Sequence, residues 1–223
     1  MGNEFLLPEP GVVAVRLAEL AGTALFWKSA ALSLLRVLIG FLAGAVVGAL
    51  LAALTAVSRW ADMIVSPAVR VLRASPVVSC ILLIQLWVFT GRVPGVCAGL
   101  MVLPVVWENV SKGIRETDPL LLEAARAYRF GSWKTARLVY LPSVLPYFAS
   151  SCATGLGLAW KAGVAAEVLC LPRLAIGLEM QNSKKYLETP DLFAWTAVVI
   201  LLSFVLENLL GRLFRQMERG RRA

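Results

Sequence analysis

Long apolar runs separated by short charged segments dominate the sequence. Residues 37–57 form 21 consecutive positions without a charge, and a helix rising about 1.5 Å per residue can cross a hydrocarbon core of about 30 Å over that length. Runs at 74–91, 93–107, 138–160 and 192–206 have the same character. The pattern predicts an all-α polytopic membrane helix bundle of about five transmembrane helices, in which the two short central runs are joined by a tight outer turn.

Composition supports a chain that lies mostly in lipid. Hydrophobic residues make up 59% of the 223 positions and charged residues 16%, with a mean hydropathy of +0.75. A soluble domain of this size needs a denser charged surface. We therefore expect residues 1–223 to form a single membrane domain, with an outer N-terminal segment at 1–29, a helix bundle at 30–214 and a basic cytoplasmic tail at 215–223.

The positive charges predict the orientation of the helices. Of the 22 Lys and Arg residues, 14 fall in the loops and tail on one side of the predicted membrane and seven on the other. Because cytoplasmic loops carry an excess of Lys and Arg, we expect the N-terminus outside and the C-terminus in the cytoplasm. This placement accounts for the net charge of +8 without a nucleic-acid partner, since no basic patch with stacking aromatics is present.

The residues that usually carry catalysis or bind metals are sparse. Histidine is absent, which removes the commonest general base and metal ligand. The four cysteines show no Cys-x-x-Cys spacing and are expected to pack as small core residues. Residues 22–29 superficially resemble a phosphate-binding loop, but Trp27 stands in place of its second glycine and no strand precedes it. We therefore expect no cofactor, no metal site and no nucleotide site in this chain.

Three glycines mark a close-packing face on the first predicted span. Gly40, Gly44 and Gly48 recur at four-residue spacing, so that a neighbouring helix backbone can approach closely. That neighbour is expected to be another helix of the same chain, with a subunit interface as the alternative.

A polar island with helical character interrupts the apolar runs between residues 118 and 142. Asp118 before Pro119 suits an N-cap followed by proline at the first helical position. Apolar residues then recur at three- and four-residue spacing, which predicts a short amphipathic helix. Gly131 is expected to end this helix and Ser132 to cap the next.

The island resembles a known motif. Glu123-Ala124-Ala125 is followed at the right interval by Val139 and by Leu141-Pro142, as in the cytoplasmic loop of permease subunits of bacterial ABC importers. Arg129 stands where that family has glycine, and a glycine follows two residues later. From this departure we predict that the turn between the two short helices has shifted to Gly131.

Other fragments are similar to the nitrate, sulfonate and taurine branch of these permeases. They are Leu6-Leu7-Pro8-Glu9-Pro10, Ala74-Ser75-Pro76-Val77, and the segment from Ala159-Trp160 to Val164-Ala165-Ala166-Glu167. Members of the family usually have one further membrane helix before the first of these fragments. Either this chain begins after that helix or the natural start lies upstream.

The resemblance implies a function and a set of partners. It implies a permease subunit of an ATP-driven importer in the bacterial inner membrane, with a second permease copy, two copies of a separate ATPase that binds the ATP, and an extracytoplasmic solute-binding protein. The substrate would be a small anion or a small organic solute. The residues expected to couple the permease to its ATPase are Glu123, Ala124, Ala125, Arg126, Tyr128 and Gly131.

Polar and aromatic residues near the predicted spans are candidates for the solute pathway, because ionisable groups at membrane depth usually face protein or water. They are Glu108, Asn109, Trp160, Lys161 and Glu167. The alternative for the polar members is interfacial snorkelling or local pairing. Lys161 and Glu167 are six residues apart, which does not favour a mutual pair on one helical face.

Two other function classes compete with the importer. A membrane enzyme or scaffold is disfavoured by the missing histidine and the lack of clustered carboxylates. A transporter or channel that works without ATP predicts intramembrane carboxylates or an inverted repeat, and the sequence shows neither. Neighbouring genes for an ATPase and a secreted binding protein would discriminate these classes.

Overall fold

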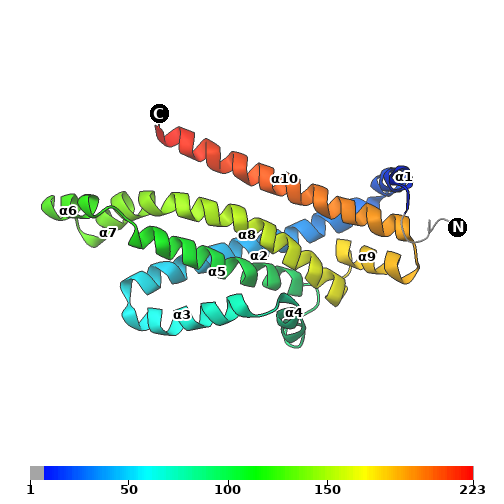
Figure 1. The fold of residues 1–223 in the computed structure, drawn as a ribbon, viewed down its shortest axis with the longest axis horizontal. Coiled ribbons are helices and arrows are strands. Elements are labelled where there is room, and N and C mark those ends of the chain that lie inside the picture. The colour runs from blue at the N-terminus through cyan, green and yellow to red at the C-terminus, as the bar shows by residue number, and fades with distance from the viewer. Residues whose placement is uncertain (1–7, 223) are drawn as a thin grey trace.

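The computed structural model describes residues 8–222 and confirms an all-α fold, with no strand in that range (Figure 1). Its helices are α1 (Pro10–Ala21), α2 (Ala24–Val57), α3 (Arg59–Ala74), α4 (Val77–Gln85), α5 (Val93–Arg115), α6 (Pro119–Ala127), α7 (Ser132–Thr135), the π-helical turn η1 (Ala136–Tyr140), α8 (Leu141–Cys170), α9 (Ile176–Lys185) and α10 (Thr189–Arg222). Leu6 and Leu7 of the first branch-like fragment lie outside the described residues.

Length and composition allow three described helices to cross a membrane, namely α2, α5 and α10 over Thr189–Arg212. A fourth crossing is possible if α3 and α4, which are bent by 105° relative to each other, form one broken span. The prediction of a separate span at 74–91 is wrong, because only the nine residues of α4 are helical there. Pro76 provides no N–H for a continuing helix, and the chain turns at this point.

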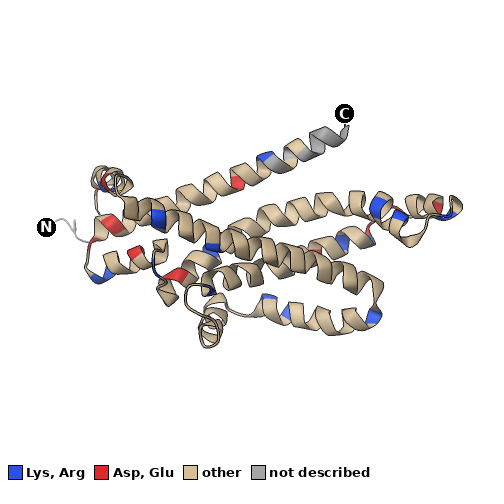
Figure 2. Cartoon of the chain, turned by 180° about the vertical axis from the view of Figure 1, so that it is seen from behind, with Lys and Arg blue, Asp and Glu red and all other residues tan. Residues whose placement is uncertain are grey.

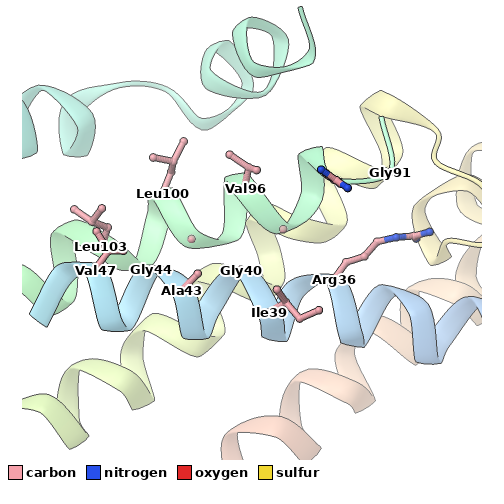
Figure 3. A pocket seen from close by; sticks show the side chains of 13 residues that line it. Arg36, Ile39, Gly40, Ala43, Gly44, Val47, Gly91, Val96, Leu100 and Leu103 are labelled. Atoms are coloured by element: carbon pink, nitrogen blue, oxygen red, sulfur yellow. The ribbon is translucent and has the colours of Figure 1, made fainter. Parts of the chain in front are cut away.

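The core of the bundle is built by α2, α5 and α8. The glycine face of α2 packs on α5 within the same chain, as the spacing predicted: a Cβ added at Gly40 or Gly44 would overlap the backbone of Gly95 or Gly99. Figure 3 shows the two helices crossing at this point. Gly95 and Gly99 repeat the same four-residue spacing, so the backbones meet through small residues on both sides.

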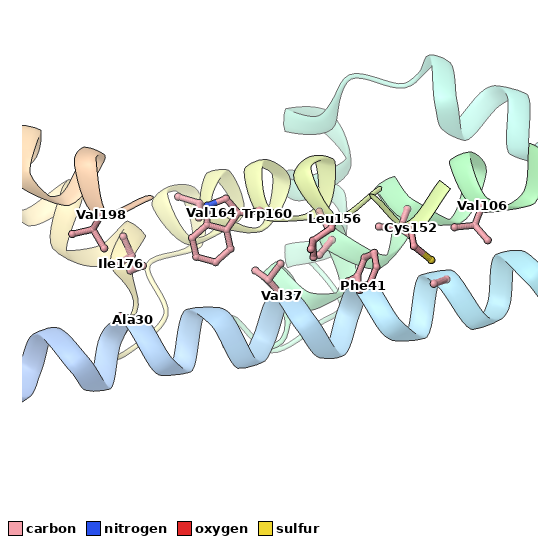
Figure 4. Close-up of a cluster of buried hydrophobic side chains, with 14 of the residues drawn as sticks. Ala30, Val37, Phe41, Val106, Cys152, Leu156, Trp160, Val164, Ile176 and Val198 are labelled. Carbon is pink, nitrogen blue, oxygen red and sulfur yellow. The ribbon is translucent and has the colours of Figure 1, made fainter. Parts of the chain in front are cut away.

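The helix α8 packs against both α5 and α2. Its side chains Leu156 and Trp160 are buried against Val37 and Phe41 of α2 (Figure 4). The sequence-based boundary at residue 160 is wrong, since the helix continues to Cys170. Residues 161–170 therefore belong to α8 and contribute buried side chains such as Val164 and Ala166.

The structure also shows the burial of the four cysteines and the positions of the two ends of the described chain. All four cysteines are unpaired, and Cys97, Cys152 and Cys170 are buried, which confirms the interpretation as core residues for these three; Cys80 is only partly buried. The N-terminal helix α1 is fastened to α10 by two hydrogen bonds from the Arg16 guanidinium to Asp191, of 2.6 and 2.7 Å. At the other terminus α10 runs to Arg222, but the side chains of Leu213, Arg215 and residues 217–223 lie outside the described part of the chain.

The bundle has two distinct ends. Helices α6 and α7 extend from one end, while α1 and α9 lie at the opposite one (Figure 1). Basic residues gather at the α6 and α7 end, as Figure 2 shows, although further ones lie at the opposite end.

Candidate functional site: an exposed helical loop and a membrane cavity

The start of α6 follows the sequence-based prediction. Asp118 is the N-cap, and its Oδ1 accepts a 2.8 Å hydrogen bond from the Leu120 N–H. Pro119 occupies the first turn, where a missing N–H costs nothing. The helix is therefore capped by its own sequence.

The end of α6 contradicts the shifted turn. The helix stops at Ala127, and Arg129 adopts the left-handed conformation with φ of 52°. The Phe130 N–H then reaches back to the Ala125 carbonyl at 2.9 Å, a Schellman-type closure in which the left-handed residue is usually glycine. Gly131 has φ of −69° and ψ of 161°, an extended conformation that any residue adopts. The turn thus stays at the family's glycine position, although an arginine occupies it.

Gly131 has a different role from the one predicted. It is the N-cap of α7, so Ser132 is the first helical residue and not the cap. The Thr135 N–H donates to the Gly131 carbonyl at 3.0 Å. The chain then passes through η1 directly into α8, and Val139, which replaces the motif's isoleucine, is buried there.

The α6 surface is open. Ala125 is buried at 4% exposure, whereas Glu123, Ala124 and Arg126 are exposed and Tyr128 is 77% exposed. Ala125 therefore seats the helix on the rest of the loop, and the other three side chains with Tyr128 are available to another protein. This division of roles within the Glu-Ala-Ala motif requires the structure, because the sequence only places the residues on one short helix.

A cavity of about 450 Å³ lies between α3, α5 and α8, and it contains two of the predicted pathway residues, Glu108 and Asn109. Glu108 forms an ion pair with Arg73 of α3. The Asn109 side-chain amide donates a 2.8 Å hydrogen bond to the Val105 carbonyl on its own helix. Thr154 of α8 also lines the cavity. An apolar cavity with a few converging polar groups is the usual form of a small-molecule site.

The other three predicted pathway residues do not line this cavity. Trp160 is 1% exposed, and its indole N–H donates a 2.9 Å hydrogen bond to the Val199 carbonyl of α10. Lys161 is exposed. Glu167 is fully buried near the C-terminal end of α8 and takes part in a separate network. The pathway residues thus divide into a cavity pair and three residues placed elsewhere.

The network around Glu167 joins three segments. Glu167 accepts hydrogen bonds from the Ser33 hydroxyl at 2.7 Å and from the Gly177 N–H at 3.2 Å. Arg36 lies 3.5 Å away and also donates to the Leu174 carbonyl at 3.0 Å. As the spacing indicated, Lys161 is not its partner. A buried carboxylate with this many donors is a structural tie between α2, α8 and the start of α9.

Sequence reasoning missed Arg73, Thr154, Ser33 and Arg36 as partners in these two sites. Arg73 and Glu108 are 35 positions apart, and Arg36 and Glu167 are 131 positions apart. No local spacing pattern links residues so far apart, so the sequence offered no signal for either pairing.

Comparison with known proteins decides the family. The family of binding-protein-dependent transport system inner membrane components matches residues 17–220. The chain belongs to this family. Its members are permease subunits, so the protein is a multi-pass inner-membrane permease and not itself an enzyme, and it works with an ATPase and a solute-binding protein.

Curated relatives of this permease are named for several different substrates. It is 29% identical to a riboflavin transport system permease of Chloroflexus aurantiacus, over 96% of this chain and 81% of the relative. It is 29% identical to a putative aliphatic sulfonates transport permease of Escherichia coli, over 93% and 76%. The taurine transport system permease of Escherichia coli is 25% identical, over 96% and 80%.

Solved structures confirm the fold of the permease. A chain from an amino acid ABC transporter crystallised with histidines aligns with a TM-score of 0.67 at 18% identity, covering 96% of this chain and all of that one. The methionine ABC transporter MetNI, in an inward-facing conformation, aligns with a TM-score of 0.64 at 19% identity, covering 85% and 93%. The permease thus has the fold of these ABC transporter chains.

Proposed function

We propose that this permease imports a small anion or a small organic solute, and that α6 couples it to ATP hydrolysis by a separate ATPase. The observation that carries the coupling role is the exposed face of α6, with Glu123, Ala124, Arg126 and Tyr128 open around a buried Ala125. Alanine at 124 leaves room for a close approach by a partner surface. Two permease copies with two ATPase copies would give each ATPase one α6 to hold.

The orientation proposed from the charges places α6 in the cytoplasm. The N-terminus would lie outside and the C-terminus inside, because 14 of the 22 Lys and Arg residues fall on the side of α6 and the tail. α1 and α9 would then face the binding protein. A reporter fused after residue 223 should be active only in the cytoplasm, and activity only outside the cell would contradict this orientation.

ATP would be bound by the partner and not by this chain. Residues 22–29 form a turn and the start of α2, and the described residues before them, 8–21, contain helix α1 and no strand, so the described part of the chain lacks the strand-loop-helix framework of a phosphate-binding loop there. The purified permease should not hydrolyse ATP by itself. Robust hydrolysis by the isolated chain would overturn this part of the proposal.

The cavity between α3, α5 and α8 is the proposed stretch of the solute pathway in this subunit. Its lining holds Glu108 and Asn109 together with Arg73 and Thr154, among apolar side chains. The relatives named for sulfonates and taurine support an anionic substrate, while the relative named for riboflavin supports a broader class of organic solutes.

The coupling role is tested with two matched tyrosines. Tyr128 and Tyr186 are both exposed residues at helix C-caps, at 77% and 67%, but they follow α6 and α9 at opposite ends of the bundle. Tyr128→Ala should lower solute-stimulated ATP hydrolysis of the reconstituted complex by about tenfold or more, as expected for an aromatic contact at an interface centre. Tyr186→Ala should leave the ATP hydrolysis of the permease–ATPase complex without binding protein near wild type, whereas Tyr128→Ala should lower this activity as well.

A second substitution addresses the exposed face of α6. Ala124→Arg should have the same effect as Tyr128→Ala while membrane insertion and thermal unfolding stay unchanged. If both α6 variants kept full stimulation, α6 would not be the coupling helix.

A further inference from the structure

An ion pair between Arg73 and Glu108 stands at the wall of the membrane cavity. The two side chains come from α3 and α5 and are 66% and 53% exposed. Among the residues that line the cavity, Arg73 is the one base and Glu108 the one acid in the described part of the chain. Most of the other lining residues, including Met101, Pro104 and Leu158, are apolar, and Asn109 and Thr154 are the uncharged polar ones. The pair is therefore accessible from the cavity and supplies the two charged side chains of its lining.

The Arg73 guanidinium has capacity for a second ligand. It presents five N–H donors in a planar fork that matches the oxygens of carboxylates and similar oxyanions. For the described residues, the structure records a single hydrogen-bond partner of this group, Glu108 Oε2. An exposed single-bond pair of this kind contributes little stability, so exchange of the partner is energetically accessible.

The neighbours of the two side chains favour replacement of Glu108 by an anion over replacement of Arg73 by a cation. Lys112 follows Glu108 by one turn of α5, and a Glu preceding a Lys by four residues is the favourable order for a helical ion pair. Lys112 is now only loosely paired with Glu116, at 3.8 Å, so it can receive Glu108. Arg73 has no comparable alternative on α3, where the nearest acidic residue, Asp62, is bonded to Ser66. An incoming anion can therefore displace Glu108, which has Lys112 as another partner. An incoming cation that took Glu108 would leave Arg73 without a counter-ion, three residues from the like-charged Arg70.

We propose that Arg73 is the anion-recognition residue of the solute pathway and that Glu108 is its resting counter-ion. A small oxyanion, such as a sulfonate or carboxylate, replaces Glu108 on the guanidinium, and Glu108 turns to Lys112. This proposal rests on the proposed function in placing the pathway in this cavity. It adds the charge of the substrate and the residue that recognises it.

The test measures the charge selectivity of the cavity directly. Thr154→Cys places a thiol in the cavity wall of a variant whose four native cysteines are replaced by alanine. In the detergent-solubilised complex with the ATPase, the labelling rate is compared between two methanethiosulfonate reagents of similar size. One carries a sulfonate and the other a trimethylammonium group.

Arg73→Gln should lower the ratio of anionic to cationic labelling by about tenfold, and Glu108→Gln should raise it by a similar factor, since local charge alters encounter rates on this scale. Arg73→Lys should keep most of the ratio. Arg70→Gln, one turn away on α3 and outside the cavity lining, is the matched control and should not change it. Ethanesulfonate should slow labelling, and ethanesulfonamide should not.

Three results would overturn the proposal: a ratio that Arg73→Gln leaves unchanged, protection by ethylammonium in place of ethanesulfonate, or no labelling at position 154 by either reagent. Failure of the proposed function looks different. In that case the reconstituted complex with its binding protein would show no solute-stimulated ATP hydrolysis, while the labelling ratios would still report the charge of the cavity.

Discussion

Ser33 and Glu167 are 134 positions apart in the sequence, and the Ser33 hydroxyl donates a 2.7 Å hydrogen bond to Glu167 Oε2. The same hydroxyl oxygen accepts the Ile176 N–H at 3.0 Å. One serine thus connects α2 to α8 and to the first residue of α9. All of these groups are buried, so each depends on the others for its hydrogen bonds.

Removing that hydroxyl should be costly. Ser33→Ala leaves the Ile176 N–H without its partner and deprives Glu167 of a donor, which should destabilise the fold by about 1–3 kcal/mol. The matched control is Ser29→Ala, one turn earlier on α2. Ser29 is equally buried, but its hydroxyl has no partner in the described structure, so its loss should be neutral or slightly stabilising. Thermal unfolding in detergent compares the two, and equal effects would contradict the role of the network.

The left-handed residue in the coupling loop gives a second prediction. Arg129→Gly should stabilise the loop by about 1 kcal/mol, because glycine adopts positive φ without a Cβ clash. Arg129→Val should destabilise it by about 1–2 kcal/mol, since β-branched residues are disfavoured there. Gly131→Val is the control: its φ is negative and an added Cβ meets nothing within 4 Å. In thermal unfolding and in coupled ATP hydrolysis, Arg129→Gly should rank highest, Gly131→Val should lie near wild type and Arg129→Val should rank lowest. A larger loss for Gly131→Val than for Arg129→Val would support a turn at Gly131 instead.

The glycine contact between α2 and α5 is the subject of a third prediction. Gly44→Ala gains up to about 1 kcal/mol of helix propensity, but the new Cβ would overlap the Gly99 carbonyl oxygen. Backbone atoms cannot move aside as a side chain can, so overpacking should dominate, with a net loss of about 1–3 kcal/mol. Gly91→Ala adds a Cβ in open space and should be tolerated. Yield of folded, detergent-stable permease distinguishes the two, and an unaffected Gly44 variant would show that the helices can separate.

Glu179 gives a prediction about pH. Burial raises the pKa of this α9 carboxyl, and a hydrogen bond with Asn182 partly offsets the effect. Because the folded-state pKa exceeds the unfolded one, the contribution of Glu179 to stability is fully present below the unfolded value and is lost as pH rises through the folded value. Glu179→Gln should therefore raise the melting temperature at neutral pH and have little effect at acidic pH. Glu188→Gln, at an exposed residue, should not change the pH profile, and a matching change there would refute the explanation by burial.

Local pattern in the sequence determined the helical elements of this protein. The uncharged run on α2 predicted a span, and the Asp118-Pro119 pair predicted where α6 begins. The four-residue glycine spacing predicted the face that meets a neighbouring backbone. Each of these depends on residues within a few turns of one another, because helix geometry repeats at 3.6 residues and caps act over three.

Tertiary structure alone decided which charged groups pair with one another and which conformation the chain adopts between α6 and α7. Arg36 meets Glu167, and Arg73 meets Glu108, only because α2, α5 and α8 pack together and α3 lies against α5. The same is true of Arg129: local preference favoured the turn at Gly131, yet the closure onto Ala125, whose side chain is buried, holds the arginine at positive φ. Packing of distant segments selects one arrangement among those that local propensity allows, since the free energy of burying whole helix faces exceeds the cost of one strained residue.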